Sequence, residues 1–168
     1  MSGGYETRMR SYCWDTSVLL ALLLGADDNR AREDILGLRA AVDDIHNDRA
    51  ALVTSTLIFA EVLLGAMTAE QYAVFERFFE RENVEVHEVT AAIARTAGEV
   101  RTRSATIGRR LQAEDAIFIA TALVADCDAL HTFDTDQLRL APMLHDELLV
   151  CRPTGTQASM DLDVPPQQ

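Results

Sequence analysis

Short apolar runs with the character of β-strands alternate with helical segments along most of the sequence. The expected strands are Ser11 to Trp14, Ala51 to Val53, Val84 to Val86, Ala129 to Thr132 and Leu148 to Cys151. Hydrophobic residues recur at helical spacing within residues 18–24, 29–46, 57–64, 69–82, 91–106 and 115–125. This alternation predicts an α/β/α sandwich with a mainly parallel central sheet, whose ligand crevice lies at the carboxyl ends of the strands.

The length of the chain suits one domain with a real hydrophobic core, since 48% of its 168 residues are apolar. We expect this domain at residues 11–152, after an N-terminal extension at residues 1–10. Residues 153–168 contain Gly155, Pro165, Pro166 and two terminal glutamines, and we expect a disordered C-terminal tail there. No apolar run approaches the roughly 20 residues of a membrane span and no secretion signal opens the chain, so we expect a cytoplasmic protein.

The charged residues exclude several classes of protein. The formal net charge is −12, and all 15 basic residues are arginines. The lack of lysine argues against P-loop enzymes, receiver domains and haloacid-dehalogenase-type phosphatases, which rely on a lysine. An acidic chain is also a poor general binder of nucleic acid, so any contact with RNA must be local.

The cysteines and histidines show no spacing typical of a zinc site. Cys13, Cys127 and Cys151 are odd in number and lack CxxC spacing, so we expect buried, reduced thiols. The histidines form no HExxH motif, and His131 is interpreted as a strand residue.

Four acidic residues stand out by their positions. Asp15 directly follows the first expected strand and Asp134 the fourth, where a turn-rich connection begins; Asp115 opens an apolar helix, and Glu61 interrupts another. Because the carboxyl ends of parallel strands meet at one edge, the four can converge on one crevice. Oxygen-only ligands suit Mg²⁺ or Mn²⁺. Each acid also has a structural alternative: a helix cap for Asp15 and Asp115, a turn for Asp134, and a buried arginine as partner for Glu61.

From Ser11 to Arg152 the chain resembles a PIN domain, specifically a VapC-type toxin of a toxin-antitoxin pair. The likeness rests on the run Asp15-Thr16-Ser17-Val18-Leu19, on Glu61 with Gly65 four residues later, and on residues 115–122 followed by Leu130-His131-Thr132-Phe133-Asp134. The sequence departs from the family at Gln112, where a lysine is common, and at Leu138, where an aromatic residue is common.

The resemblance implies a site, an activity and partners. The family's four metal-binding catalytic acids fall on Asp15, Glu61, Asp115 and Asp134, and the supporting positions are Ser17, Thr132 and Asp136. The implied activity is cleavage of RNA phosphodiester bonds with Mg²⁺ or Mn²⁺ as cofactor. The implied partners are a small antitoxin protein and a second copy of the chain in a homodimer.

Local contact with RNA is expected from four arginines just before Asp115, namely Arg101, Arg103, Arg109 and Arg110. Their alternative role is an ordinary solvated helix face. A noncatalytic binding or regulatory module with the same fold is the competing function. A DNA nuclease is a third hypothesis, which the lack of extra segments for gripping a duplex disfavours.

Overall fold

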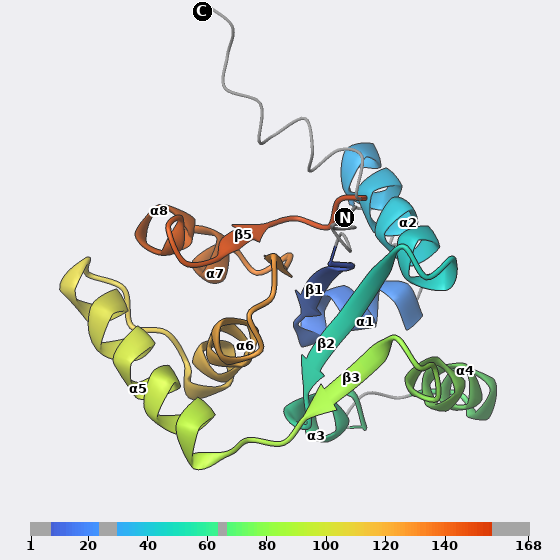
Figure 1. Ribbon diagram of the computed structural model, residues 1–168, viewed down its shortest axis with the longest axis horizontal. Helices are drawn as coiled ribbons and strands as arrows, with labels where there is room; N and C mark the ends of the chain where they lie inside the picture. Colours follow the sequence, from blue (N-terminus) through green and yellow to red (C-terminus); the bar gives the residue numbers. More distant parts are fainter. Residues whose placement is uncertain (1–7, 24–29, 64–66, 156–168) are drawn as a thin grey trace, which may run out of the picture.

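The computed structural model describes residues 8–23, 30–63 and 67–155 of the chain. Its centre is a five-stranded sheet in the order β3-β2-β1-β4-β5, in which every neighbouring pair of strands is parallel (Figure 1). The strands are β1 (Arg10–Trp14), β2 (Ala50–Ser55), β3 (Val84–His87), β4 (Ala129–His131) and β5 (Leu149–Cys151). The predicted α/β fold with a parallel sheet is therefore confirmed. Gly65, most of the expected N-terminal extension and residues 156–168 of the expected tail lie outside the described residues.

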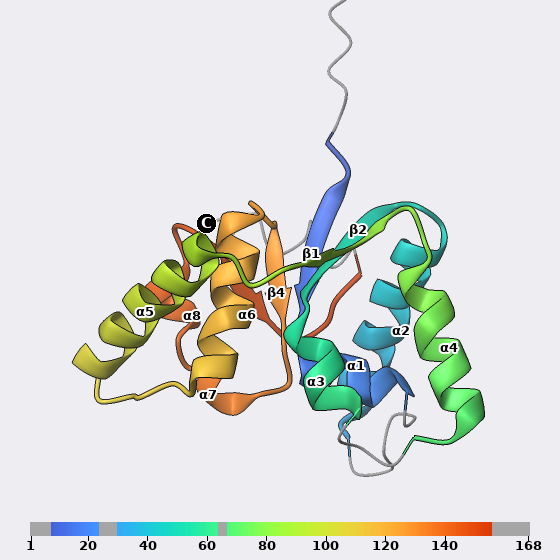
Figure 2. The ribbon, with the colours of Figure 1, turned by 90° about the horizontal axis from the view of Figure 1, so that it is seen from below.

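Helices cover both faces of the sheet, as the views along and across it show (Figures 1 and 2). They are α1 (Thr16–Leu23), α2 (Arg32–His46), α3 (Leu57–Leu63), α4 (Ala69–Phe79), α5 (Ala91–Thr106), α6 (Ala113–Val124), α7 (Thr135–Leu138) and α8 (Ala141–Leu144). One face packs against α1 to α4, and the other against α5, α6 and α8. Among the residues described, no helix combines the length and apolar character that a membrane crossing requires.

Alternation along the strands divides the core into these two layers. Tyr12 and Trp14 of β1 are buried on the side of α1 to α4, whereas Cys13 between them is buried on the side of α5 and α6. Across the seam between β1 and β4, Trp14 Nε1 donates a 3.1 Å hydrogen bond to His131 Nδ1. Burial lowers the pKa of His131 to about 3, so this imidazole is neutral and its proton resides on Nε2. His131 is thus a strand residue of the core, as predicted.

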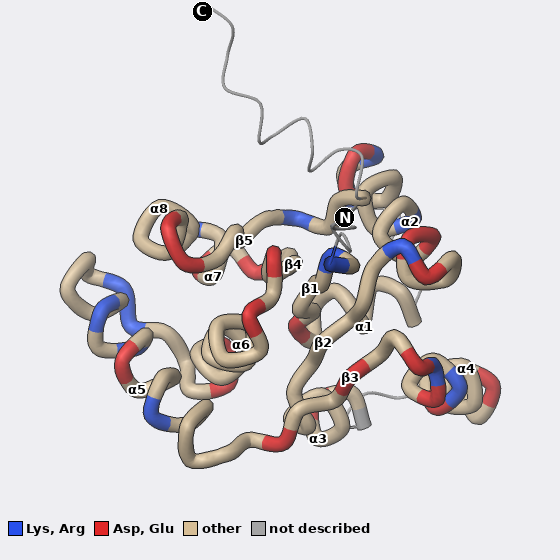
Figure 3. Tube along the Cα trace, in the orientation of Figure 1, with Lys and Arg blue, Asp and Glu red and all other residues tan. Residues whose placement is uncertain are grey.

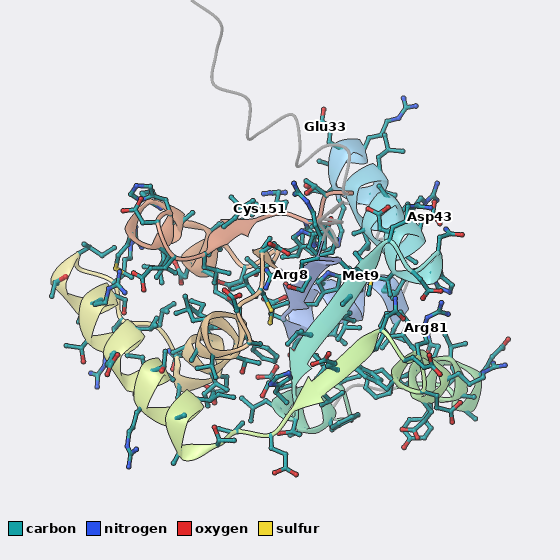
Figure 4. The ribbon with its side chains drawn as sticks, in the orientation of Figure 1. Arg8, Met9, Glu33, Asp43, Arg81 and Cys151 are labelled. Atoms are coloured by element: carbon teal, nitrogen blue, oxygen red, sulfur yellow. The ribbon has the colours of Figure 1, made fainter. Side chains whose placement is uncertain are left out.

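Local sequence signals explain where most helices begin. The Thr90 hydroxyl accepts a hydrogen bond from the backbone N–H of Ile93 and caps α5, the role that a threonine directly before a helix predicts. The connection after β4 contains two short helices that we had not expected: Asp134 caps α7, and Pro142 occupies the first turn of α8. At the start of β1, Arg8 forms ion pairs with Asp126 and Asp128 ahead of β4 (Figure 4).

One expected core residue and one expected thiol environment differ from the prediction. Helical spacing predicts Tyr72, Phe75, Phe78 and Phe79 as the core stripe of α4. Phe75 and Phe78 are buried, but Tyr72 is 41% exposed, and a hydrogen bond with Glu76 raises the pKa of its hydroxyl. The cysteines form no disulfide, and Cys13 and Cys127 are buried. Cys151 on β5 is only partly buried (Figure 4), and burial still raises the pKa of its thiol to about 11.

Candidate functional site

The candidate site lies where the direction of the chain across the sheet reverses. The chain runs outward from β1 to β2 and β3, and later returns to place β4 on the other side of β1. Trp14 is in register with His131, so Asp15 and Thr132 leave the sheet side by side. Such a switch point at the carboxyl ends of parallel strands is the usual ligand crevice of an open α/β sheet. Figure 2 shows α1, α3 and α7 along this same edge.

Asp15 is the most deeply buried of the predicted acids, with 3% of its surface exposed. Its Oδ1 accepts hydrogen bonds from Ser17 Oγ at 2.7 Å and from the backbone N–H of Val18 at 3.2 Å. The second bond caps α1. A threonine and a serine at the start of this helix, Thr16 and Ser17, also predict a cap, and that prediction is wrong because the Asp15 carboxylate accepts the bond instead. Burial raises the pKa of Asp15, and the charge of Asp134 adds to this effect against the stabilising hydrogen bonds.

Two hydroxyl groups connect Asp15 to the segment that follows β4. Thr132 Oγ1 donates to Asp15 Oδ2 at 2.6 Å and accepts from the backbone N–H of Asp134 at 2.9 Å. Ser17 Oγ, which donates to Asp15, accepts from the backbone N–H of Phe133 at 2.9 Å. Ser17 and Thr132, two of the three residues expected to support the site, therefore contact Asp15 directly and tie it to the end of β4.

Asp134 stands at the start of α7, as the cap of that helix. Its Oδ1 accepts hydrogen bonds from the backbone N–H groups of Asp136 and Gln137, at 2.9 and 2.8 Å. The side chain of Asp136 instead forms ion pairs with Arg139 at 3.1 Å and with Arg109 at 3.8 Å. The structure thus brings Asp134 to the site and places the Asp136 carboxylate among arginines at the surface.

Asp115 and Glu61 complete the group of acids. Asp115 is the third residue of α6 and makes no capping bond, so the helix-cap alternative does not describe it. Burial, together with the negative charges of Asp134, Asp15 and Glu61, raises its pKa to about 6, against the opposing effect of a hydrogen bond from Gln137. All four predicted acids therefore lie within electrostatic reach of one another.

The partner of Glu61 is a hydroxyl group, not a buried arginine. Thr16 Oγ1, in the first turn of α1, donates a hydrogen bond to Glu61 Oε2 in α3. Thr16 directly follows Asp15, so the helix that Asp15 begins also fixes the orientation of Glu61. Thr16 was not among the predicted site residues.

Gln137 is the second residue of the site that the sequence analysis missed. It is 1% exposed, and its Nε2 lies 2.9 Å from Asp15 Oδ2 and 3.1 Å from Asp115 Oδ1. The available signal was its position three residues after Asp134, because a side chain in the first turn of a capped helix can turn back toward the cap.

The donor atoms of this cluster are carboxylate and hydroxyl oxygens, and their chemistry fits a hard divalent cation such as Mg²⁺ or Mn²⁺. Across residues 8–23, 30–63 and 67–155, no three His, Cys, Asp or Glu side chains are arranged so that they could hold a metal ion together. By its chemistry, nevertheless, the donor set suits such an ion.

The four arginines considered for RNA contact lie along and after α5, where Figure 3 shows basic positions, and they differ in their contacts. Arg101 Nε donates to the carbonyl of Leu111, and Arg103 bonds both Met143 O and Glu147. Arg109 pairs with Asp136, two residues beyond Asp134, and Arg110 lines a shallow cavity beside Arg101. Arg109 is therefore the member of the set that the structure ties to the edge with the acids.

Comparisons with known proteins agree with this architecture. Among solved structures, the chain is similar to VapBC2 from Rickettsia felis bound to a promoter DNA fragment, with 14% identity, a TM-score of 0.60 and coverage of 83% of this chain and 96% of that chain. It is similar to a toxin-antitoxin complex from Klebsiella pneumoniae, with 19% identity, a TM-score of 0.58 and coverage of 86% and 98%. It is also similar to the sarcin-ricin loop cleaving toxin VapC20 from Mycobacterium tuberculosis, with 22% identity, a TM-score of 0.53 and coverage of 74% and 91%.

These identities establish a shared fold, and the sequence itself gives the family. No curated protein matches the chain. The family model of the PIN domain matches residues 12–142. This range includes all four predicted acids, namely Asp15 after β1, Glu61 in α3, Asp115 in the first turn of α6 and Asp134 after β4. The chain therefore belongs to the PIN domain family.

Proposed function

We propose that this protein is a metal-dependent endoribonuclease that acts as the toxin of a toxin-antitoxin pair. The observation that carries the proposal is the convergence of Asp15, Glu61, Asp115 and Asp134 at the switch point of the sheet, where burial and the charges of the other three acids together raise the pKa of Asp115 to about 6. Carboxylates that oppose one another's ionisation in a cleft are costly to a fold, and such groups concentrate at functional sites.

The chemistry assigns a role to each acid. A bound Mg²⁺ or Mn²⁺ lowers the pKa of a coordinated water molecule and neutralises charge on the phosphate. Asp15 and Asp134 are our choice as direct ligands, since Thr132 and the first turn of α7 hold their carboxylates in place. Asp115 has a pKa near neutrality and is suited to take a proton from the attacking water. Glu61, held by Thr16, orients that water or a second cation.

An RNA substrate is supported by one similar structure and by one arginine. VapC20, which shares the fold, is described as a toxin that cleaves the sarcin-ricin loop. In this chain Arg109, next to α7, supplies positive charge at the edge that carries the acids. A net charge of −12 elsewhere confines attraction for phosphate to such a local patch.

An antitoxin partner is supported by an apolar groove on the face away from α5 and α6. Its walls belong to α1, α2 and α4, it encloses about 260 Å³, and it includes Leu19, Leu22, Val42, Val74 and Phe78. An amphipathic helix buries its apolar side in a groove of this kind. Several structures with the same fold are complexes of a toxin and an antitoxin. The homodimer belongs to the same proposal, and light scattering of the purified protein tests it.

A cleavage assay tests the nuclease. Purified protein is incubated with RNA in Mg²⁺, in Mn²⁺ and in excess EDTA, and the products are resolved on a denaturing gel. We expect cleavage with either cation and none with EDTA. Asp43→Asn changes an exposed acid of α2 (Figure 4) and is the matched control for variants of the four acids. A folded wild-type protein that binds RNA without cutting it under any condition would establish the noncatalytic binding module instead.

A further inference from the structure

The carboxylate of Asp15 has all of its hydrogen-bonding positions occupied. A carboxylate offers about four acceptor positions, two on each oxygen. Ser17 Oγ and the Val18 N–H occupy those of Oδ1, and Thr132 Oγ1 and Gln137 Nε2 occupy those of Oδ2. A cation can bind to Asp15 only after one of these four donors leaves.

Three of the four donors are held in place by the backbone. The Val18 N–H belongs to the backbone of the first turn of α1. Ser17 Oγ and Thr132 Oγ1 each accept a second hydrogen bond, from the backbone N–H groups of Phe133 and Asp134. Moving any of these donors would break the start of α1 or the connection from β4 to α7.

Gln137 is the donor that can move. Its amide is carried on a side chain with three rotatable bonds, and the hydrogen bonds that hold it are the two from Nε2 to the carboxylates, because Oε1 is buried without a hydrogen-bond partner in the described structure. A buried amide oxygen without a partner is unfavourable, and relief of that cost offsets part of the hydrogen bonding that the amide gives up when it turns. Nε2 occupies the space between Asp15 Oδ2 and Asp115 Oδ1, where a positive charge would relieve the repulsion between the two acids.

We propose that the side-chain amide of Gln137 is a displaceable plug that bridges Asp15 and Asp115 in the cation-free protein and must leave this position when Mg²⁺ or Mn²⁺ binds. The inference rests on the proposed metal-dependent function and names the residue that regulates access to its site. The amide keeps the two carboxylates close together without a metal, and cation affinity is reduced by the hydrogen bonds that must be broken.

The first test observes the plug in the unaltered protein. In a ¹⁵N NMR spectrum the NH₂ group of Gln137, assigned by its loss in Gln137→Met, is followed as Mg²⁺ is added. We expect its resonances to shift on titration, whereas those of Gln112, an exposed glutamine at the start of α6, stay in place. Resonances of Gln137 that stay unchanged while those of Asp15 and Asp115 shift would overturn the proposal.

The second test measures cation affinity by calorimetry with Mn²⁺. Gln137→Met keeps the length of the side chain and removes the donor, and Gln112→Met is the same change outside the bridge. We expect Gln137→Met to bind Mn²⁺ at least about 10-fold more tightly than wild type, since one hydrogen bond to a charged group corresponds to about that factor and the amide makes two. The variant should also melt at a lower temperature in EDTA. Gln112→Met should match wild type in both measurements.

The outcomes separate the plug from the proposed function. Wild-type binding with equal or weaker binding by Gln137→Met would refute the plug and leave the metal-dependent function standing. Failure of both proteins to bind Mn²⁺ would refute both proposals. If Gln137→Met does not fold, Gln137→Asn takes its place, because its amide is one methylene too short to bridge both carboxylates and the same tighter binding is expected.

Discussion

The Thr132 hydroxyl donates a 2.6 Å hydrogen bond to Oδ2 of Asp15, although the two residues lie 117 positions apart in the sequence. The bond joins the ends of β1 and β4 at the point where the sheet reverses direction. Because the hydroxyl oxygen of Thr132 also accepts a hydrogen bond from the backbone N–H of Asp134, one hydroxyl group positions two of the acids. The geometry of the site therefore depends on a residue that has no charge.

Replacing this hydroxyl tests its role. We expect Thr132→Val, which keeps the shape of the side chain, to reduce cleavage about 10- to 100-fold, the usual cost of losing a partner that orients a metal ligand. The free energy of unfolding should fall by about 1–3 kcal/mol, since the Asp134 N–H loses its acceptor. Cleavage rates and urea unfolding measure the two effects. Thr102→Val on the exposed face of α5 is the control, and an equal loss there would make the effect nonspecific.

Asp15→Asn tests whether Asp15 binds the cation. Cleavage should fall by more than about 100-fold, beyond the loss typical of a ligand's partner. Mg²⁺ should raise the melting temperature of the wild-type protein more than that of the variant, because a ligand stabilises the folded state in proportion to its affinity. Melting curves with and without Mg²⁺ provide the measurement. A variant that gains as much stability from Mg²⁺ as wild type would leave Asp15 as a helix cap.

The pKa of Asp115 predicts how stability changes with pH in the absence of cations. Folding raises this pKa from 3.8 to about 6, so the folded protein binds the proton more tightly than the unfolded chain does. The contribution of Asp115 to stability is therefore neutral below pH 3.8 and becomes increasingly unfavourable as the pH rises to about 6. In EDTA, Asp115→Asn should stabilise the protein more at pH 7.5 than at pH 4.5, as measured by urea unfolding. An equal effect at both values would contradict the raised pKa.

Replacement of Arg109 should affect RNA binding, whereas replacement of Arg103 should affect stability. Arg109→Gln should weaken RNA binding and reduce the slope of affinity against salt concentration by about 0.7 for one lost contact with single-stranded phosphate. Arg103→Gln should leave that slope unchanged and lower stability, because Arg103 bonds Met143 O and Glu147. Binding titrations at several salt concentrations distinguish them. The reverse pattern would move the RNA-binding surface toward α8.

The sequence was informative where the chain runs straight from a strand into the site. Asp15 follows β1 directly, so the alternation of strands and helices was enough to place it at the carboxyl edge. Gln137 could not be predicted in this way, since its contact with Asp115 depends on how the four residues of α7 pack against α6. Tyr72 was misplaced for a related reason: helical periodicity gives the face of α4 but not how far the neighbouring helices extend over it.

The hydrogen bond between Trp14 and His131 has an optical consequence. Trp14 is the single tryptophan of the chain, is fully buried, and directly precedes Asp15. The intrinsic fluorescence of tryptophan therefore arises from one indole ring at the seam between β1 and β4. Its emission reports the opening of that seam, beside the acidic cluster, without any label and without averaging over distant parts of the molecule.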